Sequence, residues 1–171
     1  MTNVEVKARV ADVASIRRRL PGLGFRRERP RLAQTDWYFT VPRGRLKLRQ
    51  RKGDTAAELI FYVRPDRHRP RSSEFQKLPV DDPPHALRLL RAMFTPGVVV
   101  RKTRELWLRE DVRVHLDSVR YLGTFLEIEV PVRAGRPAAE ARRIMRALVR
   151  ALGITPASIL AVSYADLIAQ R

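Results

Sequence analysis

Hydrophobic and polar residues alternate one by one along several short segments, and the first is residues 3–10. In this segment, Asn-Val-Glu-Val-Lys-Ala-Arg-Val, every second residue is apolar and the others are polar or charged. Strict alternation over eight residues predicts a half-buried β-strand. One face of this strand is therefore apolar, and the other carries an acid followed by two bases.

Short segments with the same alternation of apolar and polar residues recur along the chain, and amphipathic segments separate them. Asp12 can cap a first helix, Asp81 or Asp82 with Pro83 begins a second, and Pro137 begins a third, which ends at Gly153. Residues 21–33 are rich in Arg, Pro and Gly and are predicted to be a loop. The predicted strands are residues 3–10, 34–41, 45–51, 57–64, 72–78, 98–107, 112–118 and 123–132, and the predicted helices are 13–20, 83–94 and 137–152, with a last short helical stretch after Thr155.

Eight short strands with three or four helices indicate an α+β fold that is mostly antiparallel. Residues 1–171 contain no repeat and no low-complexity linker, so we expect a single domain. In a sandwich, the charged strand faces would be the solvated outside. Amphipathic helices, however, need an apolar surface to cover, and the apolar strand faces provide one. This favours a closed eight-stranded antiparallel β-barrel, a tunnel with a charged interior and with helices packed outside.

The amino-acid composition, and above all the net charge, limits the classes of binding partner that we expect for such a protein. The 171 residues carry a net charge of +17, which suits nucleic acid, a membrane surface or a phosphorylated small molecule. Of the 35 basic residues only five are Lys, and an Arg excess of this kind can also reflect genome base composition. Cysteine is absent, and no apolar run approaches the roughly 20 residues that span a membrane. We expect a cytoplasmic protein without membrane segments.

The charged strand faces together suggest a phosphate site. A barrel interior with unpaired ions cannot be a dry core, because burying such an ion costs several kcal/mol. Lys and Arg side chains suit phosphate oxygens, and carboxylates beside them make sense if they hold Mg²⁺ or Mn²⁺. No glycine-rich phosphate loop is present, so side chains must hold the phosphate. His115 is either a general base or a structural residue, and Tyr38 and Tyr62 either contact the substrate or support the wall.

Short motifs along the chain, among them Asn-Val-Glu-Val-Lys at residues 3–7 and Ser-Tyr-Ala-Asp-Leu at 163–167, stand in an order that resembles the CYTH, or triphosphate tunnel metalloenzyme, family. The family opens with Glu-x-Glu-x-Lys, and residues 3–7 read Asn-Val-Glu-Val-Lys here. The ending Ser-Tyr-Ala-Asp-Leu at 163–167 resembles the class IV adenylyl cyclase branch. Further similar stretches are residues 34–39, 46–49, 59–66, 100–104, 116–119 and 125–129.

The resemblance implies an eight-stranded tunnel with divalent-metal chemistry on triphosphates, and it assigns roles by position. Glu5, Lys7, Glu127 and Glu129 would be catalytic. The metal, Mg²⁺ or Mn²⁺, would be held by Glu5, Glu127 and Glu129, with Asp117 close by. The phosphate-binding residues would be Lys7, Lys47, Arg49, Arg64, Lys102 and Arg104, to which strand parity adds Arg9, Arg51 and Arg113.

One departure from the family pattern affects the expected activity. Asn3 replaces the first glutamate of the opening motif, so one metal site loses a negative charge while phosphate binding is left nearly intact. The expected function is cyclisation of ATP to cyclic AMP and pyrophosphate. The alternatives are a triphosphatase for tripolyphosphate, thiamine triphosphate or a nucleotide, an enzyme for an organic diphosphate, or a polyphosphate-binding module without turnover.

Two further expectations concern partners and access. A nucleic-acid partner is not expected, because the sequence shows no basic stripe with interleaved aromatic residues outside the strands. A homodimer is compatible with the pattern. The basic segment 64–71 is either a lid over the phosphate or a solvated loop.

Overall fold

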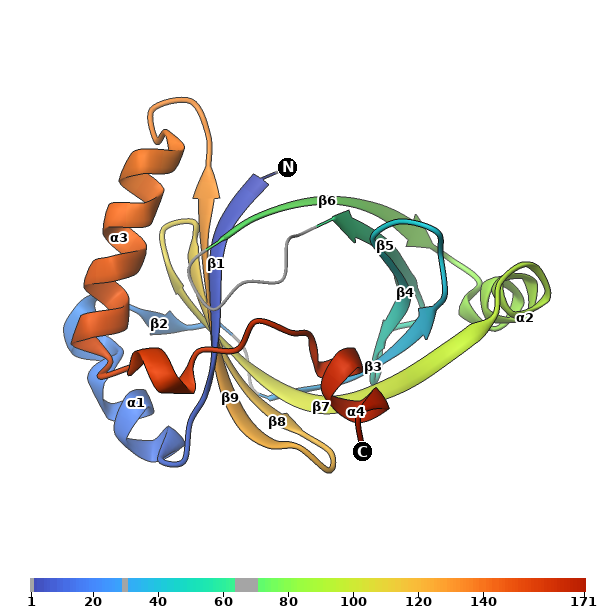
Figure 1. Ribbon diagram of the computed structural model, residues 1–171, viewed down its shortest axis with the longest axis horizontal. Helices are drawn as coiled ribbons and strands as arrows, with labels where there is room; N and C mark the ends of the chain where they lie inside the picture. The colour runs from blue at the N-terminus through green and yellow to red at the C-terminus, as the bar shows by residue number, and fades with distance from the viewer. Residues whose placement is uncertain (1, 29–30, 64–70) are drawn as a thin grey trace.

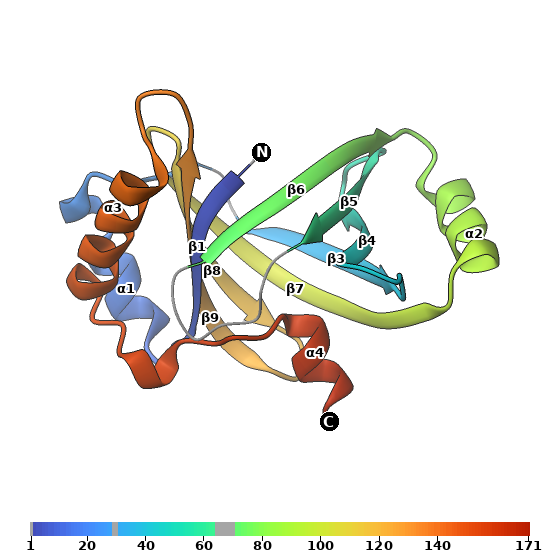
Figure 2. The same cartoon turned by 45° about the horizontal axis from the view of Figure 1, so that its top comes forward.

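Antiparallel strands form one curled sheet, and four α-helices lie around it (Figures 1 and 2). This computed structural model describes residues 2–28, 31–63 and 71–171, with the backbone alone for 71–74. The strands are β1 (Thr2–Arg9), β2 (Arg26–Arg27), β3 (Leu32–Phe39), β4 (Arg45–Arg51), β5 (Ala57–Val63), β6 (Arg71–Val80), β7 (Pro96–Arg109), β8 (Val112–Val119) and β9 (Gly123–Val132). The helices are α1 (Val13–Arg19), α2 (Pro83–Met93), α3 (Ala138–Ala151) and α4 (Tyr164–Ala169), with short 3₁₀ turns η1 (Pro21–Leu23) and η2 (Pro156–Ser158).

The strand order places distant parts of the chain side by side. It runs β2-β7-β3-β4-β5-β6-β1-β9-β8, and β8 also pairs with β7. The register sets Lys7 opposite Glu127, and Glu127 opposite His115 on the next strand. On the other side of β8, Asp117 lies opposite Arg104 of β7. Side chains directly opposite each other lie close enough to interact, so this register brings the predicted charges together.

The predicted α+β class and the antiparallel strands are confirmed, and all eight predicted strands are present. The predicted loop at residues 21–33 is wrong in part, since it holds η1, the strand β2 and the start of β3. Arg26 and Arg27 of β2 pair with Leu108 and Trp107. This pairing is a tertiary contact, and a segment rich in Arg, Pro and Gly gives no local signal for it.

Side-chain caps explain where the helices begin. The Asp12 carboxylate accepts a hydrogen bond from the Ser15 amide (2.8 Å), and Asp82 accepts one from His85 (3.0 Å). These bonds satisfy amides that have no partner within the helix. Ser163 and Asp166 form a reciprocal capping box at the start of α4, which fixes the position of this short helix.

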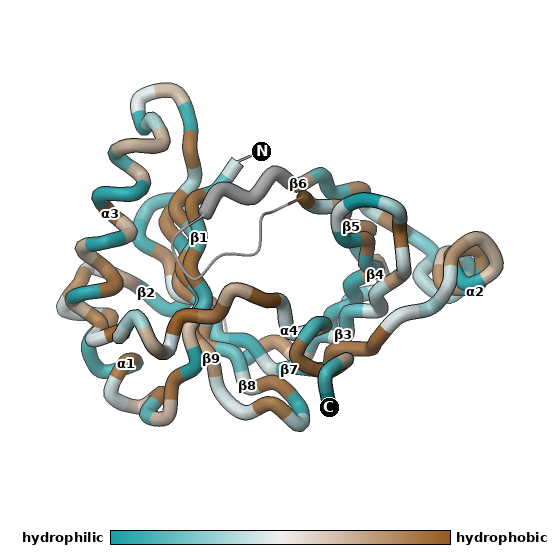
Figure 3. The backbone as a smooth tube through the Cα atoms, in the orientation of Figure 1, coloured by the Kyte–Doolittle hydropathy of each residue, from teal (hydrophilic) through white to brown (hydrophobic). Residues whose placement is uncertain are grey.

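The main apolar core lies between α1 and α3 and the outward face of β1, β8 and β9. Val6, Ile128 and Met145 are examples of its fully buried side chains. A second cluster lies under α2, against β4 and β5, and a third joins α4 to Phe125 and Val100. Figure 3 shows hydrophobic residues interspersed with hydrophilic ones along these strands. The apolar side chains face the helices, and the intervening charged ones project from the inner face of the sheet.

The described parts of the chain contain no helix that is both long enough and apolar enough to cross a lipid bilayer.

Candidate functional site

A cavity of about 120 Å³ lies on the inner face of the curled sheet. Its lining combines carboxylates, bases and aromatic rings from strands that are far apart in sequence. Of the predicted site residues, it brings together Glu5, Lys7, Arg49, Lys102, Arg104, Arg113, Glu127 and Glu129. Asn3, Tyr38, Tyr62 and Tyr164 also line it.

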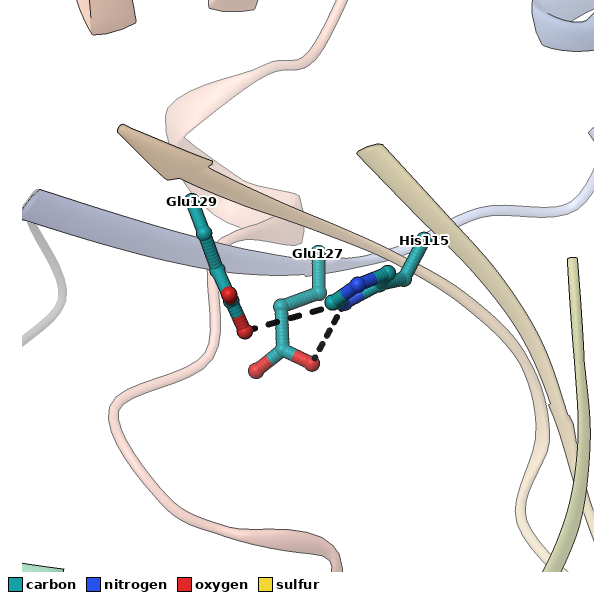
Figure 4. Close-up of side chains that lie close together, drawn as sticks. All are labelled: His115, Glu127 and Glu129. Carbon is teal, nitrogen blue, oxygen red and sulfur yellow. Dashed lines mark ion pairs between the residues drawn. The ribbon is translucent and has the colours of Figure 1, made fainter. Parts of the chain in front are cut away.

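Three possible metal ligands face one another across two adjacent strands. His115 on β8 and Glu127 and Glu129 on β9 point toward a common centre (Figure 4). The Nδ1 atom of His115 lies 3.5 Å from Oε2 of Glu127 and 3.7 Å from Oε1 of Glu129. One ligand atom from each residue lies within 4.8 Å of the other two.

The chemistry of this trio fits a divalent cation. His115 is 5% exposed, and its Nδ1 atom has no hydrogen-bond partner among the described residues. Burial, and then the positive charge of Arg104, lowers the pKa of His115, so its imidazole is neutral at pH 7. Burial opposes ionisation of Glu127, but Lys7 and the other cations around it hold its pKa well below the usual value. A neutral ring nitrogen and two carboxylates in contact are all electron-pair donors, and a shared cation satisfies them.

β1 supplies the rest of the acidic side. Glu5 is 8% exposed and Asn3 is 5% exposed, and both line the same cavity. In the strand register Glu5 lies directly opposite Glu129. Lys7 lies two residues after Glu5 on β1, and it donates a hydrogen bond to Glu127 (3.0 Å). The opening motif of the sequence therefore faces the trio of His115, Glu127 and Glu129.

Arg104 joins the acidic side to a basic one. Its guanidinium donates two hydrogen bonds to Asp117 (2.7 and 2.6 Å) and one to Glu127 (2.8 Å). Lys102 lies 3.3 Å from the same Asp117 carboxylate. Burial, and next the neighbouring charge of Arg104, lowers the pKa of Lys102 to about 7. These surroundings favour the neutral amine of Lys102 more than water favours that of a free lysine.

A second basic group comes from β3 and β4. Asp36 is 2% exposed and holds Lys47 at 2.9 Å, while Arg49 binds its two oxygens at 2.7 Å each. The ring of Tyr38 lies against the Lys47 amine, with its centroid 5.4 Å away. The Asp36 carboxylate therefore holds Lys47 and Arg49 in place, and the three side chains together keep a net positive charge.

Asp117 has a different setting from the trio. Its oxygens accept hydrogen bonds from Arg104, from Lys102 and from the Tyr164 hydroxyl (2.9 Å). It is 1% exposed. Tyr164 belongs to α4, so Asp117 ties that helix to the inner face of the sheet. Among the described residues, the group that could hold a metal ion includes His115 and not Asp117.

The remaining predicted phosphate ligands differ in position: Arg113 lines the cavity, whereas Arg9, Lys47 and Arg51 are not in its lining. Arg9 is exposed, and its guanidinium donates to the Leu122 carbonyl (2.6 Å). Arg51 pairs with Glu58 (3.0 Å), outside the lining of the cavity. The side chain of Arg113 is 41% exposed and donates to Glu129 (3.3 Å). Arg64 and residues 65–70 of the predicted lid lie outside the described residues.

Sequence reasoning missed several residues of this site. Lys77 and Phe75 of β6 line the cavity, as do Ser163 and Tyr164. The facing of β6 could not be assigned from its mixed pattern. The motif at 163–167 was noticed only as a family resemblance, although its cap residues beside a tyrosine were a local signal for a fixed helix start.

Known proteins share this architecture and these motifs. The CYTH domain family matches residues 1–164, which confirms the resemblance drawn from the sequence. A relative from Methanocaldococcus jannaschii, provisionally named an adenylate cyclase, is 23% identical over 175 residues that cover 98% of both chains. A solved Pyrococcus horikoshii structure has a TM-score of 0.86 at 26% identity and covers 96% of this chain and 98% of its own.

A more distant structure shares the fold alone. It comes from Hippeastrum, is described as having a dominant triphosphatase activity, and has a TM-score of 0.64 at 13% identity. The alignment covers 97% of this chain and 93% of that one. The family match over nearly the whole sequence identifies the chain as a member of the CYTH family.

Proposed function

We propose that this protein is a divalent-metal-dependent enzyme that acts on the triphosphate group of a small-molecule substrate. One observation carries the proposal. Glu127 and Glu129, two of the three metal-type donors, line one cavity together with the cations Lys7, Arg49, Lys102 and Arg104, and His115 and Lys47 lie beside them. Phosphate oxygens need both, since cations hold the anion and a metal ion neutralises the charge that develops during transfer.

The circuit of strand pairings supports a closed tunnel. Each of the strands other than β2 has at least two antiparallel partners, and the pairing of β8 with β7 closes the circuit from β7 through β3, β4, β5, β6, β1, β9 and β8. In such a tunnel the charged inner faces enclose the substrate, and the helices cover the apolar outer faces. The ion pairs already present compensate the buried charges before any substrate arrives.

The acidic side would hold the metal, Mg²⁺ or Mn²⁺, through Glu127 and Glu129 with His115, and Glu5 would complete the site. When bound, the ion would polarise a phosphoryl oxygen. Lys7, Arg104 and Lys102 would bind phosphate oxygens on one side of the cavity. Lys47 and Arg49 would bind them on the other.

Because of the ion pairs at Glu127, binding of the metal ion and binding of the triphosphate should affect each other. Lys7 and Arg104 are now held by Glu127, at 3.0 and 2.8 Å. A cation on Glu127 competes with both bases and frees them for phosphate. Metal and triphosphate should therefore bind together more tightly than either does alone.

Two reactions are open to this constellation. In cyclisation, the ribose 3′-hydroxyl of ATP attacks the α-phosphorus and pyrophosphate leaves, which agrees with the name of the archaeal relative. In hydrolysis, water attacks the terminal phosphorus and orthophosphate leaves, which agrees with the activity described for the Hippeastrum protein. We place cyclisation first and hydrolysis second, because the archaeal relative is the more similar of the two.

Phosphorus NMR of the purified protein with ATP, and separately with tripolyphosphate, tests the proposal with Mg²⁺ and with Mn²⁺. Cyclic AMP with pyrophosphate would establish cyclisation, and orthophosphate would establish hydrolysis. Shifted or broadened resonances without products would reduce the protein to a binding module. No change in any resonance would overturn the proposal.

A further inference from the structure

The opposite face of the same sheet carries a second hollow, of about 640 Å³, across β4, β3, β7 and β8. Its floor is made of small side chains, including Thr35, Thr103 and Ser118. Each of these alternates with a residue of the inner face, such as Asp36, Lys102 and Asp117, and so projects to the outside. The main helix-covered cores draw on other parts of the sheet, so this floor stays open to solvent.

Cations surround this outer hollow. Lys52, Arg101 and Arg120 are exposed and line it, and Arg51 stands at its edge. Asp54 is the one acidic residue in the lining, and it lies 3.5 Å from Arg51. Some other surface arginines are paired with carboxylates, as Arg17 and Arg31 are with Glu105. The outer hollow therefore has an uncompensated positive charge.

An exposed aromatic ring stands beside these cations. Tyr121, in the turn between β8 and β9, is 66% exposed and has a φ of 68°. A non-glycine residue in this left-handed region is uncommon and mildly strained. Arg120 lies 4.8 Å from the ring centroid and Arg171 lies 5.9 Å from it, and Arg171 also donates to the Tyr121 carbonyl. The amide of Arg120 donates to the Arg101 carbonyl (2.9 Å), so the ring and the hollow form one continuous surface.

We propose that this outer hollow and Tyr121 bind single-stranded nucleic acid. The cations would hold successive phosphates across the floor of small polar residues, and a base would stack on the ring of Tyr121. A single strand fits better than a duplex, because a stacking platform needs an unpaired base. This site lies mainly on the outer face and shares only Lys102 with the described lining of the inner cavity, and it does not depend on the proposed triphosphate chemistry.

The strand order explains why the linear sequence does not predict a nucleic-acid partner. Lys52, Arg101, Arg120 and Arg171 lie on four separate segments, and only the strand order brings them beside Tyr121. No basic stripe with interleaved aromatic residues exists in the linear sequence. The stripe is formed across strands.

Fluorescence anisotropy with a labelled 12-nucleotide mixed-sequence RNA tests the proposal. The RNA carries a 5′-hydroxyl, and the buffer contains EDTA, so that neither a triphosphate end nor a metal ion can recruit the tunnel. The affinity should fall with salt at a log–log slope of about −3, as expected for about four phosphate contacts on a single strand. A matched DNA 12-mer should also bind, because the contacts are to phosphates and one base face.

Two variants and a control locate the binding. Arg101→Glu/Arg120→Glu should weaken binding at least about 30-fold and flatten the salt slope. Tyr121→Ala should weaken it about tenfold with little change in slope, because it removes stacking and not charge. Arg142→Glu/Arg146→Glu makes the same change in net charge on exposed positions of α3 and should lower affinity less than threefold.

Three results would overturn the inference. Equal loss in the α3 control would mean that net charge alone attracts the RNA. Competition by tripolyphosphate at equimolar amounts would place the RNA in the tunnel. Absence of binding at low salt would remove the site, while leaving the tunnel proposal to its own phosphorus NMR test.

Discussion

The two faces of β1 and β9 are equally well buried and chemically opposite. On the outer face, Val6 and Ile128 are at most 2% exposed and pack against α1 and α3. On the inner face of the same strands, Lys7 and Glu127 are 5% and 8% exposed and form an ion pair. Apolar burial contributes directly to the free energy of folding, whereas a buried ion pair contributes little after its desolvation cost.

In β1 and β9, the residues of the outer face stabilise the fold, and the residues of the inner face serve the proposed function. The outer face explains why the sheet holds its shape. Burying the charges of Glu5, Lys7 and Glu127 on the inner face costs desolvation energy, and the proposed ligand would use these fixed charges. Substitutions on the two faces should therefore change different measurable quantities.

The largest effect should follow loss of a carboxylate from the metal trio. Glu127→Gln or Glu129→Gln should lower kcat about 1000-fold with the product identified by phosphorus NMR, because the metal ion loses a charged ligand. The thermal unfolding transition should remain cooperative, since the amide keeps the shape of the side chain. Glu28→Gln, on an exposed carboxylate, serves as the matched control and should leave kcat unchanged. An equal loss of kcat and of the folded state in Glu127→Gln would make that residue structural.

The outer face should give the converse result. Ile128→Ala should reduce the free energy of unfolding by about 3 kcal/mol, because it leaves a cavity in a fully buried core. The dissociation constant for Mn²⁺ with tripolyphosphate, measured calorimetrically on the folded protein, should stay within twofold. A large change in that constant would mean that the two faces of β9 are not independent.

The lowered pKa of Lys102 on the inner face predicts that ligand binding depends on pH. Its folded pKa of about 7 lies below the ordinary value of 10.5, so the unfolded chain binds more protons between these values, and its contribution to stability rises with pH across this window. Phosphate raises the pKa of the bound amine. Tripolyphosphate binding at pH 8 should therefore take up close to one proton, seen by calorimetry in buffers of different ionisation enthalpy. In Lys102→Arg this uptake should largely disappear, and its persistence there would assign the proton to another group.

Asn3 should give the smallest effect. Asn3→Glu adds a carboxylate beside Glu5 and should strengthen Mn²⁺ binding by about tenfold or less, measured by electron paramagnetic resonance of free Mn²⁺. Asn3→Gln is the control without added charge. Unchanged affinity in Asn3→Glu would mean that this position is too far from the ion to act on it.

The sequence predicted the strands well because they depend on local alternation. The positions of Glu5, Lys7, Arg49, Lys102 and Arg104 on the cavity follow from their parity within short strands. Parity also predicted Arg9 and Arg51 for the site, and the structure places both outside the cavity lining. Alternation predicts which face of the sheet a side chain occupies, but it does not predict how far along the strand the cavity lies.

Other features depend on contacts between distant segments. The sequence grouped Asp117 with the metal ligands, but its oxygens are taken by Arg104, Lys102 and Tyr164. His115 was left open between a base and a structural residue, and only the strand register places it against Glu127 and Glu129. Pairing of this kind across strands is set by the whole sheet.

The most direct test of the central claim is calorimetric titration of tripolyphosphate into the protein with and without Mn²⁺. The ion pairs of Glu127 with Lys7 and Arg104 predict one site per chain and binding at least about tenfold tighter in the presence of the metal. Equal affinity with and without Mn²⁺, or no binding in either case, would contradict the account of a metal-assisted triphosphate cavity.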